Sequence, residues 1–225
     1  MKRVVDVAVS ALALALLWPL GLVIAAAVTL GDGGPAFFRQ ERVGRGGRTF
    51  RMWKYRTMIV DAERGGRHLT VGEDPRVTRV GAVLRRTKLD ELPQLLNVLR
   101  GEMSLVGPRP EVPHYVALYS PDQRAVLSLT PGITDPASLR YRDESEELAE
   151  SAEPERTYVD HILPEKIRLN LAYAAQATWL TDIGVIWATL RTLLARGQSG
   201  DVQSESTPSA DDAGRESMAQ SAVGR

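Results

Sequence analysis

One uncharged stretch, residues 7–30, constrains the fold of this 225-residue chain more than any other feature. As an α-helix rising ~1.5 Å per residue it would be ~36 Å long, enough to cross a hydrocarbon core of ~30 Å. Pro19 lies near its middle, where a proline removes a backbone hydrogen bond and kinks the helix. Basic residues flank both ends, and basic flanks favour the cytoplasm. A spanning helix and a kinked segment that enters and leaves on one side are therefore both open.

A cleaved signal peptide is a third alternative, because residues 25–27 are three alanines that resemble a small-residue cleavage site. The apolar stretch is longer than the usual core of a signal peptide, however, and many arginines follow at once. We therefore predict a retained membrane helix over residues 1–31.

The overall composition excludes several functional classes. Lysine plus arginine and aspartate plus glutamate both number 28, so no net charge attracts nucleic acid, and we expect no nucleic-acid partner. The chain has no cysteine, which excludes disulfides, thiolate metal sites and a cysteine nucleophile. His68, His114 and His161 are scattered without metal-ligand spacing, which argues against a zinc site or a histidine-based triad.

Positive charge is concentrated in a short segment after the apolar stretch. Seven of the residues from Arg39 to Arg56 are lysine or arginine, and only Glu41 opposes them. Residues 49–58 alternate as a strand does, and residues 37–44 could pair with them as a β-hairpin. Such a basic face suits anionic lipid headgroups, and it equally suits substrate phosphates.

Residues 88–110 carry the chemistry that the sequence suggests. Asp90 and Glu91 stand side by side before Pro93 and an apolar helical pattern, which predicts a helix that starts near Asp90 and stops at Gly101. Arg109 lies between two prolines, which fixes a guanidinium suited to phosphate on a stiff loop. An Asp-Glu pair before a helix is more often a cap and a solvated charge, yet carboxylates beside phosphate-binding groups suggest phosphoryl chemistry.

This segment resembles the signature of the bacterial sugar transferases, the monotopic polyprenyl-phosphate phosphoglycosyl transferases of the minimal catalytic-domain type. The resemblance is carried by residues 89–95, 97–99 and 101–110, with further motifs at 40–44 and 54–58, and it extends over roughly residues 2–194. It implies an α/β, mostly helical cytoplasmic domain with a short β-hairpin over residues 32–196. It also implies that residues 1–31 form a re-entrant membrane helix broken at Trp18-Pro19.

The resemblance implies a reaction as well. A sugar 1-phosphate would pass from a UDP-sugar to polyprenyl (undecaprenyl) phosphate with release of UMP, as the initiating step of exopolysaccharide or glycoconjugate synthesis. Asp90 would be the nucleophile that forms a phosphosugar–aspartyl intermediate, and Glu91 would hold the metal or orient a phosphate. The expected cofactor is Mg²⁺, with Asp90 and Glu91 as its protein ligands. The enzyme would lie at the inner membrane, in contact with lipids, with its catalytic domain on the cytoplasmic side; a homodimer is left open.

Several arginines are expected to bind the anionic substrates. Arg42, Arg56, Arg85 and Arg109 are the predicted phosphate-binding residues. Residues 135–144 depart from the pattern of the family where it contacts the donor, so the sugar is not predicted, and Arg140 and Arg142 are the candidates for donor diphosphate contacts.

The sequence of the C-terminal part predicts helices followed by a disordered tail. Residues 158–174 read as one helix, and residues 183–194 carry an apolar stripe, with Trp179 and Trp187 typical of a membrane interface. Residues 197–225 have the composition of a disordered tail. A different function is consistent with the same features: a non-catalytic membrane module that binds anionic lipid, or a polysaccharide-assembly partner, through its arginine face.

Overall fold

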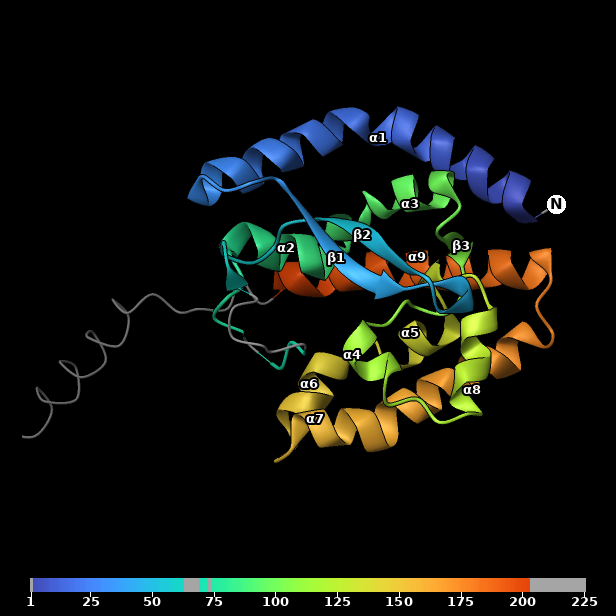
Figure 1. The fold of residues 1–225 in the computed structure, drawn as a ribbon. Coiled ribbons are helices and arrows are strands. Elements are labelled where there is room, and N and C mark those ends of the chain that lie inside the picture. The colour runs from blue at the N-terminus through green and yellow to red at the C-terminus, as the bar shows by residue number, and fades with distance from the viewer. Residues whose placement is uncertain (1, 63–68, 73, 203–225) are drawn as a thin grey trace, which may run out of the picture.

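The computed structural model describes residues 2–62, 69–72 and 74–202, and they form the mostly helical fold that we predict, with two small sheets (Figure 1). The helices are α1 (Lys2–Asp32), α2 (Arg79–Thr87), α3 (Gln94–Arg100), α4 (Pro113–Val116), α5 (Pro136–Arg140), α6 (Glu144–Ala149), α7 (Pro154–Thr157), α8 (Leu163–Ala174) and α9 (Trp179–Val202). The strands are β1 (Phe37–Val43), β2 (Thr49–Tyr55), β3 (Ser104–Val106) and β4 (Gly132–Thr134).

Helix α1 arches over one side of the molecule and leaves most of its apolar side chains exposed (Figure 1). It is long and apolar enough to cross a membrane. The helix continues through Pro19. The interruption that we predict at Trp18-Pro19 is therefore not present as a gap between two helices.

Both ends of α1 are held by the rest of the domain. Near the N-terminus, Lys2 donates to the carbonyl of Val106 at 3.0 Å and pairs with Asp182, while Asp6 accepts from the hydroxyl of Ser104 at 2.8 Å. At the other end, Asp32 forms an ion pair with Arg56. The N-terminal and C-terminal turns of α1 are thus fixed to one and the same body.

The predicted hairpin is confirmed. Strands β1 and β2 pair antiparallel, with Phe37 opposite Tyr55 and Val43 opposite Thr49. The side-chain amide of Asn97 fixes α3 to this hairpin, because it accepts from the backbone of Trp53 at 3.0 Å and donates to the carbonyl of Arg51 at 2.9 Å.

A second sheet was not predicted. Strand β4 pairs in parallel with β3, with Ser104 opposite Gly132, although Pro131-Gly132 is a dipeptide typical of a turn. The pairing brings two glycines into close contact, since a Cβ on Gly132 would lie only 2.1 Å from the backbone nitrogen of Gly107. This contact sets the start of the loop that carries Arg109.

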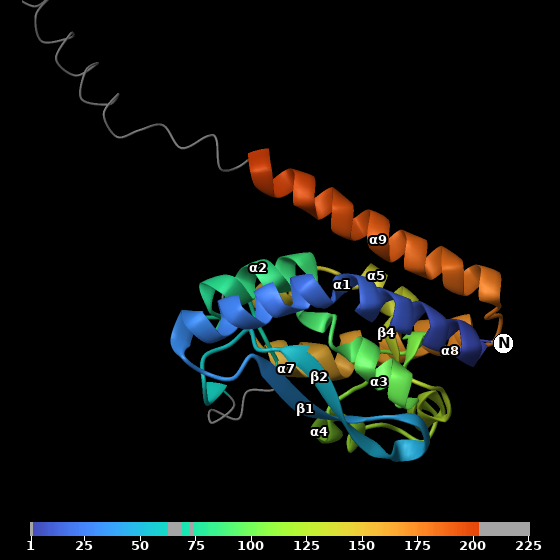
Figure 2. The same cartoon turned by 90° about the horizontal axis from the view of Figure 1, so that it is seen from above.

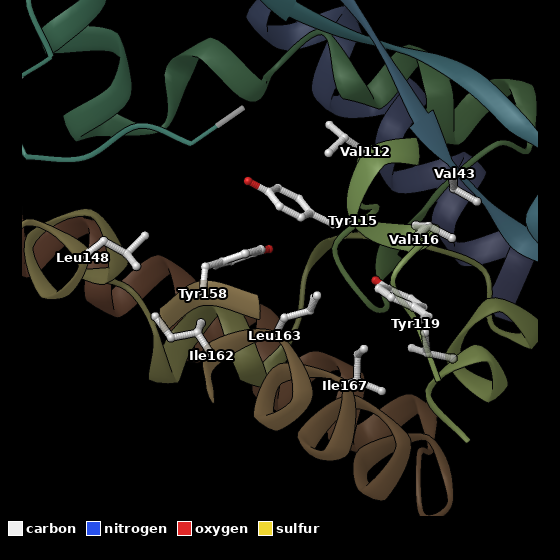
Figure 3. Close-up of a cluster of buried hydrophobic side chains, with 11 residues drawn as sticks. Val43, Val112, Tyr115, Val116, Tyr119, Leu148, Tyr158, Ile162, Leu163 and Ile167 are labelled. Atoms are coloured by element: carbon white, nitrogen blue, oxygen red, sulfur yellow. The ribbon is translucent and has the colours of Figure 1, made fainter. Parts of the chain in front are cut away.

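The largest core cluster lies between α4 and the C-terminal helices (Figure 3). Tyr115 and Tyr158 are tilted against each other with ring centroids 5.0 Å apart, beside Ile162 and Leu163. Tyr158 opens a π-helical turn, Tyr158–Ile162, that leads into α8. The acidic segment after Asp143 forms α6 and α7, and it contributes the fully buried Leu148 to this core.

Helix α9 runs along the outside of the domain beside α2 (Figure 2). It begins at Trp179, ahead of the apolar stripe that we predict over residues 183–194, and the hydroxyl of Thr178 accepts from the backbone nitrogen of Thr181 at 3.2 Å. The helix continues past Gly197 to Val202, and residues 203–225 of the predicted tail lie outside the described residues.

Candidate active site

A cleft of about 2080 Å³ lies between the hairpin, the end of α2, the loop before α4 and helix α9. Its lining includes Asp90 and Glu91 together with four cationic side chains: Lys54, Arg42, Arg85 and Arg109. Residues from distant parts of the chain therefore meet around the carboxylate pair.

The carboxylates lie in a turn that precedes the predicted helix. Lys88 adopts a left-handed conformation with φ 57°, which ends α2 and starts the 3-10 turn Leu89–Glu91. Helix α3 begins at Gln94 rather than near Asp90, and it ends as predicted at Gly101, whose φ is 85°. Asp90 and Glu91 are both buried, so neither is the solvated charge of a simple helix cap.

Glu91 is bound by Arg109 in a two-pronged ion pair. The guanidinium donates to Oε1 at 2.6 Å and to Oε2 at 3.3 Å. Burial alone would raise the pKa of the Glu91 carboxyl, but the charges of Arg109 and Lys54 outweigh it and lower the pKa below its usual range. Glu91 is therefore an anion that holds Arg109 in place at the cleft.

Asp90 is in the opposite situation. Its Oδ1 atom is buried and accepts no hydrogen bond from the residues that the structure describes. Burial, and then the charge of Glu91, raise the pKa of the Asp90 carboxyl. A buried carboxylate oxygen without a partner is costly, and its raised basicity makes it a better nucleophile or ligand than an ordinary aspartate.

Lys54 belongs to this site, although the sequence did not single it out. Burial, reinforced by Arg109 and Arg42, lowers its pKa to about 7. Within the described residues no carboxylate pairs with its ammonium group at ion-pair distance, so the charge is only partly compensated. The available signal was strand alternation: Lys54 shares a face of β2 with the buried Met52.

Arg42 is held next to this group by an acidic partner. It donates to Oε1 of Gln40 at 2.6 Å, to the carbonyl of Pro110 at 3.0 Å and to Oε1 of Glu111 at 3.3 Å. Glu111 in turn accepts from the hydroxyl of Tyr158. The guanidinium of Arg42 is thus oriented at the cleft by its own strand and by the loop before α4.

Arg85 approaches Asp90 from the end of α2. Its Nε donates to the hydroxyl of Thr57 at 2.8 Å. Helix α2 passes very close to the segment that follows β2, since a Cβ on Gly81 would lie 2.0 Å from the carbonyl oxygen of Thr57. Burial lowers the pKa of Arg85, and the charge of Asp90 opposes that shift, so the two groups attract each other.

Three predicted binding residues are placed differently. Arg56 reaches the cleft, but its guanidinium is occupied by Asp32 and by the carbonyls of Pro35 and Met58. Arg140 does not line the cleft and stacks over the ring of Tyr141 at 5.6 Å. Arg142 lines the cleft, although it is exposed and paired with Asp143 at 2.9 Å.

The acidic side chains that the structure describes along the cleft do not form a ready-made metal site. Among the described residues, no group of three or more histidine, aspartate or glutamate side chains has the spacing of a metal site. Asp90 and Glu91 remain the adjacent pair of hard oxygen donors, and both oxygens of Glu91 already accept from Arg109. Oδ1 of Asp90 is the buried oxygen of this pair that has no hydrogen-bond partner among the described residues.

A family model described as bacterial sugar transferase matches residues 1–196 of the chain. The chain belongs to the bacterial sugar transferase family. This membership confirms the resemblance drawn from residues 88–110, and the matched range includes α1 and all the cleft residues described above.

Relatives of this bacterial sugar transferase include two whose names state their reactions. A UDP-glucose:undecaprenyl-phosphate glucose-1-phosphate transferase of Caulobacter vibrioides is 39% identical over 204 residues, which are 86% of this chain and 69% of the relative. A UDP-N-acetylgalactosamine-undecaprenyl-phosphate N-acetylgalactosaminephosphotransferase of Aeromonas hydrophila is 34% identical over 193 residues, 86% of this chain and 43% of the relative. The exopolysaccharide production protein ExoY of Rhizobium meliloti is 43% identical over 150 residues, 59% of this chain and 66% of the relative. The chain thus spans less than two thirds of the last two relatives.

Proposed function

We propose that this protein transfers a sugar 1-phosphate from a UDP-sugar to undecaprenyl phosphate and releases UMP, as the first step in building an exopolysaccharide or related glycan. The observation that carries the proposal is the state of Asp90, a buried carboxylate with a raised pKa and an unpartnered oxygen among four cationic side chains. The names of the relatives supply the substrate classes.

The reaction takes place in two displacements at phosphorus. An oxygen of Asp90 attacks the β-phosphorus of the donor, and the bond between that phosphorus and the bridging oxygen of UMP breaks, so that UMP leaves with the electron pair. The resulting phosphosugar–aspartyl group is then attacked by a phosphate oxygen of the polyprenyl phosphate. The bond between phosphorus and Asp90 breaks, and the carboxylate is regenerated.

The other charged groups of the cleft position the phosphates. Arg109, held by Glu91, and Lys54 lie where they can neutralise the donor diphosphate, and Arg85 approaches Asp90 from the other side. Positioning and charge neutralisation supply most of the catalysis in phosphoryl transfer. Glu91 therefore acts through Arg109 as a positioning residue.

Mg²⁺ is the proposed cofactor, and the donor set fits it. Mg²⁺ commonly binds one or two carboxylates together with substrate phosphates and water, and Asp90 Oδ1 is free to serve as such a ligand. When bound, the ion would reduce the negative charge of the donor diphosphate.

Helix α1 is proposed to enter and leave the membrane on one side, with the catalytic domain in the cytoplasm. Lys2 and Asp6 hold its first turns, and Asp32 holds its last turn, to the same body. A helix spanning the bilayer would place these two ends on opposite sides of a hydrocarbon core ~30 Å thick. The exposed Trp179 and Trp187 of α9 would lie at the interface of the same membrane.

The test is UMP release from a panel of UDP-sugars by detergent-solubilised protein with undecaprenyl phosphate and Mg²⁺. We expect release with one donor and its loss in Asp90→Asn, while Asp122→Asn, an exposed aspartate outside the cleft, keeps wild-type activity. Substantial turnover by Asp90→Asn would contradict the role of Asp90. The rival function, a lipid-binding module, predicts no UMP from the wild type and equal lipid binding by both variants.

A further inference from the structure

Part of the cleft lining is apolar rather than charged. Helix α9 lines the cleft with Ile186, Leu190 and Leu193, which recur at the i, i+4, i+7 spacing of one helical face. Leu92 and Leu95, just after the carboxylate pair, line the same cleft. We call these five side chains the apolar arm of the cleft.

The apolar arm is linked to the active site through helix α2 and reaches the exposed apolar surface of the molecule. Helix α2 packs against both α9 and the turn Leu89–Glu91 that carries the carboxylates, and Leu92 follows that turn directly. At its other side, Leu190 is 48% exposed and lies on the helix that also exposes Trp187. Helix α9 is fixed here by a hydrogen bond of 2.7 Å between the hydroxyls of Thr189 and Thr134.

Positively charged side chains line the cleft together with the apolar arm. Arg85 and Arg86, from the last turn of α2, line the same cleft, and Arg86 is exposed. A ligand that enters along α9 therefore meets apolar side chains along its length and positive charge next to Asp90. This combination matches an amphiphile with one anionic head and a long hydrocarbon chain.

We infer that the apolar arm binds the isoprenoid units of the acceptor nearest its phosphate, between α9 and residues 92–95. The inference rests on the proposed function and names where the lipid acceptor lies within it. The donor is a poor fit for the arm, because its sugar and uridine need hydrogen-bond partners that leucine and isoleucine do not offer. The acceptor phosphate, by contrast, must reach a buried aspartate while its chain stays out of water.

The test compares two substitutions on the same face of α9. Leu190→Asn alters the arm, whereas Ile183→Asn, two helical turns away and 54% exposed, lies outside the cleft and is the matched control. Leu190→Trp is a second variant, which fills the arm without making it polar. Each protein is assayed with undecaprenyl phosphate and with a short, soluble prenyl phosphate, and separately for the single UMP released from the donor without acceptor.

We expect both Leu190 variants to lower kcat/KM for undecaprenyl phosphate by about tenfold or more, with a smaller change for the short acceptor and none for Ile183→Asn. UMP release without acceptor should persist in every variant. Equal losses in Leu190→Asn and Ile183→Asn would assign this face to general membrane contact and overturn the inference, as would equal losses for both acceptors. A wild type that releases no UMP from any donor would instead overturn the proposed function.

Discussion

Two basic residues at the end of β2 have opposite environments, although only one residue separates them. Arg56 donates to Asp32 at 2.6 Å, to the carbonyl of Pro35 at 2.7 Å and to the carbonyl of Met58 at 3.1 Å. Lys54 lies among Arg42 and Arg109, with a pKa lowered to about 7 by burial and by those charges. The charge of Arg56 is paired within the protein. The charge of Lys54 is buried next to other positive charges, which is energetically unfavourable.

The difference separates a structural region from a ligand-binding one. Around Arg56, each charge has its partner, and the result is a link between the end of α1 and the hairpin. Around Lys54, positive charges crowd together and Asp90 keeps an unpartnered oxygen, a combination that is typical of a ligand-binding site. The predictions below test this division.

The largest effect is expected from Arg109→Ala. It leaves the buried Glu91 without its partner, which typically costs about 3–5 kcal/mol in the free energy of unfolding, and it removes a phosphate-binding cation. Because the folded-state pKa of Glu91 lies below its unfolded value, the stability from this pair is present above about pH 4.3 and is lost as the pH falls below it. Urea unfolding of wild type and variant at pH 7 and pH 4 measures the loss of stability in the variant and its dependence on pH. Equal free energies of unfolding for the two proteins at pH 7 would contradict the pairing of Arg109 with Glu91.

Lys54→Met should weaken activity and yet stabilise the protein in a pH-dependent way. We expect kcat/KM to fall by about 10- to 100-fold, the usual effect of losing a hydrogen bond to a charged group. Between pH 7 and about 10.4 the unfolded chain holds a proton on Lys54 that the folded protein has lost, so wild-type stability rises across this range. The variant should therefore be more stable than the wild type at pH 6.5, with a difference that shrinks towards pH 10.

Denaturant midpoints of both proteins at pH 6.5, 8 and 9.5 provide that measurement. A constant difference at all three values would mean that Lys54 titrates normally and does not bear the cost that we assign to it.

Arg56→Gln should show the reverse pattern, with lower stability and nearly unchanged chemistry. The substitution removes the link to Asp32, so the thermal midpoint should fall, while kcat/KM of the folded protein stays within about threefold of wild type. Arg51→Gln, at an exposed position on β2, the strand that ends just before Arg56, is the control for general loss of charge. A large loss of activity at unchanged stability would move Arg56 back among the phosphate-binding residues.

The smallest effect is expected from Arg140→Gln. Arg140 stacks on Tyr141 outside the cleft, so UMP release should change by less than about twofold. Titration of the donor concentration for wild type and variant checks this, and a raised KM for the UDP-sugar would show that Arg140 reaches the donor.

Local patterns were sufficient to predict much of this molecule. The alternation of residues 49–58 predicted β2, and Gly101 marked the end of α3, because both signals depend on a few neighbouring residues. Asp90, Glu91 and Arg109 were recognised as a group because 18 residues or fewer separate them and the family motif spans them all.

What the sequence did not show depends on contacts between distant segments. The pairing of β3 with β4 joins strands 28 residues apart, and Pro131-Gly132 at the start of β4 is more typical of a turn than of a strand. Arg56 looked like a phosphate ligand because Asp32, its partner, lies across the turn after α1. The lowered pKa of Lys54 arises from Arg109 and Arg42, which only the folded chain brings near it.

The most direct test of the account is to look for the intermediate on Asp90. The protein is incubated with its UDP-sugar and Mg²⁺ in the absence of polyprenyl phosphate, UMP is quantified, and the mass of the intact protein and of its peptides is measured. We predict one UMP per protein molecule and an added sugar phosphate on the peptide that contains Asp90, both absent in Asp90→Asn. UMP that forms only when acceptor is present, with no adduct on that peptide, would contradict the covalent role of Asp90.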